Sequence, residues 1–171
     1  QRWASYSLGI IFFVLSSQNL VSSPIDHHQE RFEDVALKIW EYAELGYLEE
    51  KSSGLLQQEL KDSGFTIQSG VAGIPTAFIA EYNNGGPVLG ILGEFDALPG
   101  LSQQNVPFKT AEGLSSANGH ACGHHLFGAA SAWAVVAIKE WLEESGTPGT
   151  IRFYGTPAEE GGSGKVYIAR D

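Results

Sequence analysis

The chain has 171 residues, of which 43% are hydrophobic and 18% are charged, a balance typical of a globular core and not of a disordered chain. The formal net charge of −10 disfavours a nucleic acid as partner, because binding a polyanion requires Lys and Arg to displace its counterions. A single cysteine, Cys122, excludes an intrachain disulfide, and the length suits one domain or part of a larger one.

The first 23 residues carry a short apolar run at residues 8–15, behind Arg2 and ahead of a polar stretch. The run is too short to span a bilayer and resembles a secretory signal peptide, although a buried segment or the end of a fragment fits equally well. We therefore leave residues 1–23 out of the fold argument. The compartment stays open between the cytoplasm and, if the run is a signal peptide, a secreted or periplasmic location.

Two helices are predicted next. Over residues 26–45 the apolar side chains follow the i, i+3, i+4, i+7 spacing of an amphipathic helix, and Gly46 provides a stop. A second helix is predicted to begin at Ser52 or Ser53 and to end at Asp62, before Gly64.

Short strands follow, predicted over residues 65–68, 76–81 and 88–92. The Asn- and Gly-rich turn at residues 83–87 predicts that the last two strands form a hairpin.

The second half of the chain predicts a long loop at residues 97–119, a buried helix at 124–144, a strand at 150–155 and a loop at 157–164. Strand, helix and strand between residues 88 and 155 form a βαβ unit, whose crossover requires parallel strands. We therefore predict an α/β fold with a mostly parallel sheet and helices packed on it. In such sheets the functional residues lie beyond the carboxyl ends of the strands.

The string GHACGHH at residues 119–125 contains three of the five histidines and the only cysteine. Imidazole and thiolate are the usual ligands of zinc-like ions, and the start of a helix would lower the pKa of the thiol. Cys122 and His124 can share one ion. His120 can reach the same ion or hydrogen-bond one of its ligands, and the role of His125 is the least defined.

Two acidic strings lie at the same predicted edge. In TPAEEGGSG, one of the adjacent carboxylates Glu159 and Glu160 can bind metal while the other acts as a general base. In GEFDALPG, Asp96 or Glu94 can accept a hydrogen bond from a ligand histidine.

Together these strings resemble the dinuclear-metal peptidase and amidohydrolase family of carboxypeptidase G and aminoacylase, and look most like its branch of p-aminobenzoyl-glutamate hydrolase and animal dipeptidases. The resemblance begins at about residue 26. It implies that Cys122, His124 and Glu160 bind metal, that Glu159 is the general base and that Asp96 supports the metal site. Glu94 stands where many members have His, and His125 where relatives often have Asp or Asn, so neither receives a role.

The resemblance further implies that residues 26–171 are the N-terminal portion of a zinc-peptidase-like catalytic domain, with further histidine ligands and an inserted dimerisation domain outside this chain. It implies two divalent ions per site, Zn or Mn, and hydrolysis of N-acyl-amino acid, aminobenzoyl-glutamate or dipeptide-like amides by a homodimeric full-length protein. We expect no membrane span, and we expect residues 1–171 alone to be inactive.

Two alternatives remain open on the sequence alone. Cys122 could be the nucleophile of a cysteine hydrolase, with a nearby histidine as its base. The chain could also be a catalytically incomplete metal-binding domain, although Glu159, the implied base, is present.

Overall fold

The computed structural model describes residues 25–108 and 117–171. The segment that resembles a signal peptide and residues 109–116 of the predicted long loop lie outside these ranges. None of the helices within them is long and apolar enough to cross a membrane.

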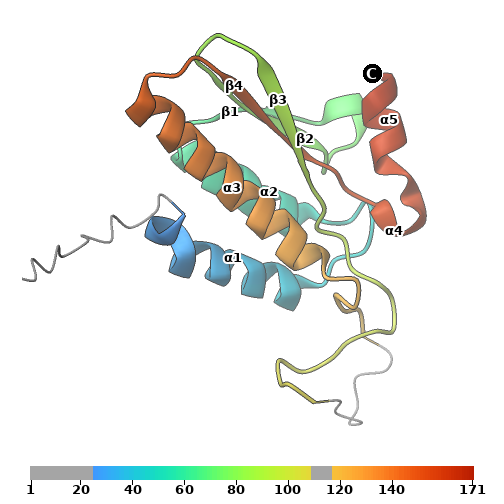
Figure 1. Cartoon of the computed structure of the whole chain (residues 1–171). Helices are drawn as coiled ribbons and strands as arrows, with labels where there is room; N and C mark the ends of the chain where they lie inside the picture. The colour runs from blue at the N-terminus through green and yellow to red at the C-terminus, as the bar shows by residue number, and fades with distance from the viewer. Residues whose placement is uncertain (1–24, 109–116) are drawn as a thin grey trace, which may run out of the picture.

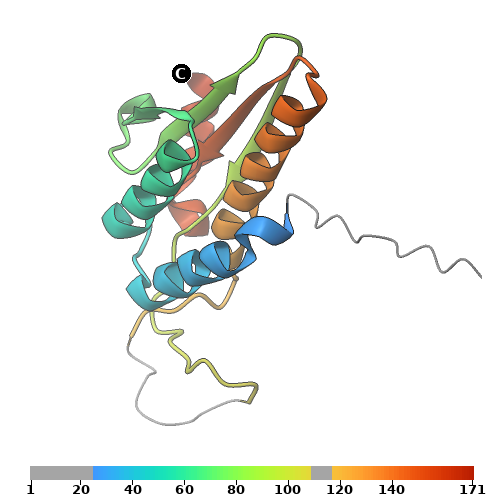
Figure 2. The same cartoon turned by 90° about the vertical axis from the view of Figure 1, so that its left-hand side faces the viewer.

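Three long helices gather on one side of the sheet (Figures 1 and 2). α2 (Glu50–Asp62) and α3 (His124–Ser145) pack against the strands, and α1 (Gln29–Tyr42), preceded by the short 3-10 helix η1 (Asp26–His28), packs onto α2 and α3. The apolar stripe of α1 is buried, as its spacing predicts, and the helices and sheet share one core of aromatic and aliphatic side chains that includes Phe32, Ile39, Leu56, Phe78, Val135 and Phe153.

The four strands are β1 (Thr66–Ser69), β2 (Phe78–Asn83), β3 (Val88–Gly93) and β4 (Thr150–Gly155), in the order β1-β2-β4-β3. β3 and β4 are parallel and joined through α3, so the predicted βαβ unit is confirmed. β1–β2 and β2–β4 are antiparallel. The α/β class is therefore confirmed, but the described part of the sheet is mixed and not mostly parallel.

The predicted hairpin between β2 and β3 is wrong, because β4 lies between them. β4 carries buried Ile151 and Phe153 and takes the better-covered position, while β3 forms an edge with Val88 and Leu89 exposed. The connection at residues 83–87 crosses the end of β4 to reach β3. It is hydrogen-bonded to β4 there, because the Thr150 hydroxyl donates to the carbonyl of Gly85 at 3.1 Å.

Two short helices follow β4. α4 (Glu159–Gly162) is a single irregular turn inside the predicted loop, and α5 (Gly164–Arg170) packs near the 3-10 turn η2 (Val71–Gly73). In Figures 1 and 2 they lie on the side of the sheet away from α1.

Candidate metal centre

Three segments far apart in sequence meet beyond the carboxyl ends of β3 and β4. The hydroxyl and N–H of Thr156 both donate to the carbonyl of Gly93, at 3.1 and 2.9 Å, which fixes the two strand ends together. At Gly128 of α3 a Cβ atom would come within 2.5 Å of the carbonyl oxygen of Glu94, so glycine is needed for the helix to approach β3 this closely.

His124 is the centre of the site. Its Nδ1 lies 2.8 Å from Oδ1 of Asp96, and its Nε2 lies 2.9 Å from Oε2 of Glu94. Nε2 is also 3.8 Å from a carboxylate oxygen of Glu159 and 3.9 Å from one of Glu160. The Asp96 hydrogen bond is the main cause that raises the pKa of His124.

Asp96 is hydrogen-bonded both to the His124 ring and to the backbone of α4. Although burial opposes it, hydrogen bonds from His124 and from the backbone N–H of Glu160 hold the pKa of Asp96 below its usual value. The second of these bonds, to Oδ2, is 2.9 Å long. A carboxylate that accepts the Nδ1 proton of a histidine leaves the Nε2 lone pair for a metal ion. Asp96 thus lies where the resemblance places a supporting residue.

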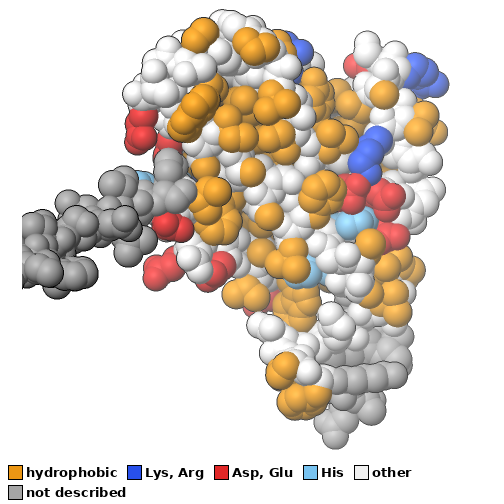
Figure 3. Space-filling view, in the orientation of Figure 1, with side chains coloured by type: hydrophobic (Ala, Val, Ile, Leu, Met, Phe, Trp, Pro, Cys, Tyr) orange, Lys and Arg blue, Asp and Glu red, His pale blue; other side chains and the backbone are white. Residues whose placement is uncertain are grey.

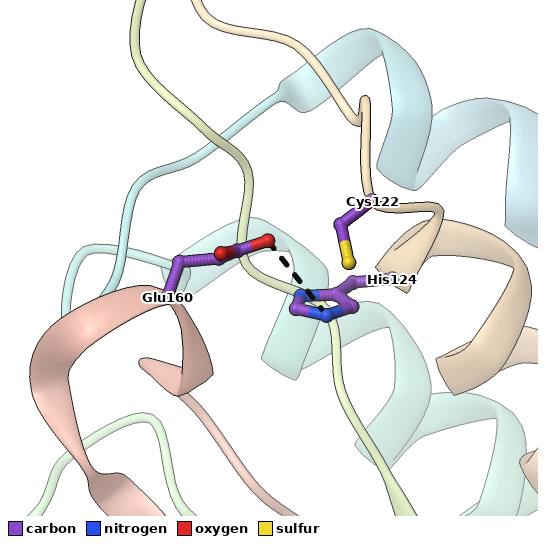
Figure 4. A group of neighbouring side chains, drawn as sticks. All are labelled: Cys122, His124 and Glu160. Carbon is purple, nitrogen blue, oxygen red and sulfur yellow. Dashed lines mark ion pairs between the residues drawn. The ribbon is translucent and has the colours of Figure 1, made fainter.

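Donor atoms of two residue groups converge at this point. Cys122, His124 and Glu160 form one group and Glu94, His124 and Glu159 the other, with the donor atoms of each within 4.8 Å of one another. Figure 4 shows Cys122 in the loop before α3, His124 at the start of α3 and Glu160 on α4 pointing toward one another. Oε1 of Glu160 is buried and accepts no N–H or O–H hydrogen bond within the described residues.

This donor set fits a divalent ion. Thiolate, imidazole and carboxylate are zinc ligands, and imidazole with carboxylates also suits manganese. A cation would bind the Glu160 oxygen that no N–H or O–H donor reaches, and its charge would offset the carboxylates around His124. The residues present are therefore suited to hold a divalent ion at His124, whose one free nitrogen can serve either group but not both at once.

The sequence-based expectation for the Cys122 thiol is wrong. Although the residue is exposed, desolvation of its sulfur and the carboxylates of Glu160, Glu159 and Glu94 raise the pKa of the thiol. The nearby helix start, with Gly123 as its cap, does not outweigh these negative charges. Metal binding would reverse this, because a coordinating thiol is deprotonated by the charge of the ion.

The other two histidines of the string face elsewhere. His120 bonds through Nε2 to the carbonyl of Ile39 on α1 at 3.0 Å, and its ring lies against that of His125, with centroids 5.0 Å apart. Burial lowers the pKa of both, that of His125 to about 4. Neither belongs to a group of three donor residues among the described residues.

Glu94 is the residue that the family resemblance left without a role, although its position had suggested an acceptor for a ligand histidine. It is 9% exposed, pairs with His124 and accepts a hydrogen bond from Lys165 of α5, a residue that no motif singled out. Its position directly after β3, two residues before Asp96, was the available signal. Figure 3 shows acidic side chains gathered beside histidine and a basic side chain on this face of the molecule.

These features describe an α/β domain with a cluster of candidate metal ligands beyond the carboxyl ends of its parallel strands. Residues 90–170 match the model of peptidase family M20/M25/M40. The chain is 44% identical over 151 residues to one of the subunits of the p-aminobenzoyl-glutamate hydrolase of Escherichia coli, covering 88% of this chain and 31% of that protein. It is 33% identical over 159 residues to a human Xaa-Arg dipeptidase, covering 83% of this chain and 32% of that protein.

Among solved structures, a Bacillus subtilis protein described as a dinuclear metal binding peptidase of this family superposes with a TM-score of 0.70 and 26% identity, over 85% of this chain and 39% of that one. The chain belongs to the M20 family of peptidases and amidohydrolases. It spans about a third of the length of the curated relatives it matches.

Proposed function

We propose that this chain contributes the Cys122, His124, Glu159 and Glu160 side of the active centre of a metal-dependent amidohydrolase. The observation that carries the proposal is the position of His124, whose Nε2 lies within 3.9 Å of three carboxylates while Asp96 binds its other nitrogen. A divalent ion held there would polarise the scissile carbonyl and lower the pKa of a water beside it.

Glu159 is the proposed general base. Its side chain is 42% exposed, so a water and a substrate can reach it, whereas the side chain of Glu160 is 21% exposed and turns inward. Glu159 would take the proton of the attacking water on a carboxylate oxygen and pass it to the departing amide nitrogen. Glu160, Cys122 and His124 would serve as metal ligands.

The proposed substrates are small amides of the N-acyl-amino acid, aminobenzoyl-glutamate or dipeptide-like class. The names of two relatives point there: one belongs to a p-aminobenzoyl-glutamate hydrolase and the other is a dipeptidase. The acidic balance of the chain agrees with a small-molecule substrate and not with a polyanion. The homodimer implied by the resemblance stays a prediction for the full-length protein.

A cysteine-nucleophile mechanism has less support. The pKa of the Cys122 thiol is raised, which reduces the reactive thiolate, and the Nε2 atom of His124 is paired with Glu94 instead of serving the thiol as a base. A chelator separates the mechanisms, because removing the metal abolishes metal-dependent hydrolysis and spares a cysteine hydrolase.

Metal analysis of the full-length protein tests the site. We expect Cys122→Ala and Glu160→Ala each to lower bound zinc or manganese, with activity falling in parallel, because each removes a donor from the first group. Glu81→Ala is a matched control, since that carboxylate pairs with Arg152 on the sheet, away from the site. Unchanged metal content in both site variants would disprove the assignment.

A further inference from the structure

The buried carboxylate of Glu49 lies behind the α4 turn that carries Glu159 and Glu160. We propose that Glu49 is a positioning residue, which holds Ala158 in the conformation that directs the two glutamates toward His124. This inference rests on the proposed function, because it assigns importance to the placement of Glu159 and Glu160.

Glu49 is fully buried, with 0% of its surface exposed. Oε1 accepts the backbone N–H of Ala158 at 2.8 Å, and Oε2 accepts the hydroxyl of Thr76 at 3.0 Å. No Lys, Arg or His forms an ion pair with it in the described part of the chain. Burying a carboxylate without a cation is unfavourable, so a purely space-filling role would be met better by an apolar side chain.

Ala158 is the residue that needs holding. It has φ 56° and ψ 45°, a left-handed conformation that non-glycine residues rarely adopt, and it is 1% exposed. A Cβ atom at Gly46 would lie 3.0 Å from both Cα and Cβ of Ala158, so the chain before α2 packs directly against this residue. The next two residues are Glu159 and Glu160, so the dihedral angles of Ala158 set the direction of the chain that carries both side chains.

Tyr47 supports the same turn from its far end. Its hydroxyl donates to the carbonyl of Gly162, and its own backbone is also left-handed, with φ 66°. A Cβ atom at Gly162 would come within 2.7 Å of the Tyr47 ring, so the ring lies flush against α4. Two side chains from residues 47–49 therefore fix the two ends of α4, while Asp96 binds the N–H of Glu160 between them.

This arrangement connects the hydrogen bond of Glu49 to catalysis. A misplacement of about 1 Å in a reacting group can cost on the order of 100-fold in rate. Loss of the Glu49 carboxylate frees the N–H of Ala158 and lets the dihedral angles relax toward ordinary values. Glu159 would then shift relative to His124, although no atom of Glu49 touches the site.

The test compares four variants of the full-length enzyme at saturating metal. We expect Glu49→Ala to lower kcat by at least about tenfold with a smaller change in KM, because the base is displaced while substrate contacts elsewhere persist. Glu49→Gln keeps an acceptor for the N–H of Ala158 and should retain kcat within about threefold of wild type. Tyr47→Phe removes one hydrogen bond from a partly exposed ring and should lower kcat by a few fold.

Glu44→Ala is the matched control. The Glu44 carboxylate accepts the backbone N–H of Ser52 at 2.8 Å and that of Lys51 at 3.0 Å. Both hydrogen bonds hold the first turn of α2, and neither reaches α4. We expect this variant to lower the melting temperature while kcat stays at the wild-type value. If the role of Glu49 were merely structural, Glu49→Ala would likewise lower the melting temperature and leave kcat at the wild-type value.

A folded Glu49→Ala enzyme with wild-type kcat overturns the inference, as does a loss of kcat no larger than that of Glu44→Ala. If Glu49→Ala does not fold, the other two variants decide. The inference is overturned if Tyr47→Phe has wild-type kcat and if the activity lost in Glu49→Gln equals the fraction of that variant that is unfolded. Failure of the proposed function is distinguishable, because the wild-type enzyme would then show no metal-dependent amide hydrolysis at all.

Discussion

His124 and His125 are adjacent in sequence, yet their rings meet opposite environments. His124 turns toward Asp96, Glu94 and the α4 glutamates, and its pKa is raised. His125 turns toward His120 near α1, and burial lowers its pKa to about 4. Successive residues at the start of a helix point about 100° apart, so neighbours can face different elements. A histidine-rich string can therefore contain both a proposed metal ligand, His124, and a packing residue, His125.

The largest expected effect lies on the His124 side. Glu159→Gln should keep the metal and lower turnover by roughly 10²–10⁴-fold, because it removes the proposed general base and leaves the proposed ligands Cys122, His124 and Glu160 in place. Metal content and kcat measured on the same preparation check this. Parallel loss of metal and turnover would mean that the roles of the two glutamates are exchanged.

A smaller effect is expected from Asp96→Asn. The amide can present its oxygen to only one of the two donors that Asp96 now serves, the His124 ring and the N–H of Glu160. Metal affinity should fall by about 10–100-fold. The measurement is a metal-buffer titration, with Asp34→Asn as control, since Asp34 is exposed on α1 and pairs with Lys38. Equal affinities in the two variants would contradict a supporting role for Asp96.

The smallest effect belongs to the His125 side. His125→Gln should leave metal content unchanged, because His125 is in neither donor group. It should alter the pH dependence of stability in the metal-free protein. The folded pKa of about 4 lies below the unfolded value near 6.5, so the contribution is fully present above pH 6.5 and is lost as pH falls toward 4.

Partial exposure limits that contribution to about 1–2 kcal/mol. Denaturant unfolding between pH 4 and 7 measures it as the difference between wild type and His125→Gln, with His27→Gln on η1 as the control for an exposed histidine. Identical pH slopes in wild type and His125→Gln would show that His125 titrates alike in the folded and unfolded chains. Loss of metal in His125→Gln would break the contrast between the two histidines.

The local elements of this protein were predictable from sequence. Apolar periodicity located α1, the Ser start and the stop before Gly64 located α2, and apolar composition located α3, each to within a few residues. The βαβ connection, together with the rule that functional residues follow parallel strands, was enough to bring Asp96, Cys122 and Glu160 to one edge of the sheet. The motifs were specific enough to indicate the family.

Only the tertiary structure decided the features that depend on competition between distant groups. β4 lies between β2 and β3 because burial of Ile151 and Phe153 outweighs the short turn that predicts a hairpin. The Cys122 thiol has a raised pKa because desolvation of its sulfur, together with the carboxylates of Glu160, Glu159 and Glu94, outweighs the helix start. Glu94 accepts a hydrogen bond from Lys165, and Glu49 accepts one from the backbone N–H of Ala158, 109 residues away. Periodicity and spacing describe what a segment does locally, whereas these outcomes depend on which distant charges and backbone groups the fold places within a few ångströms of one another.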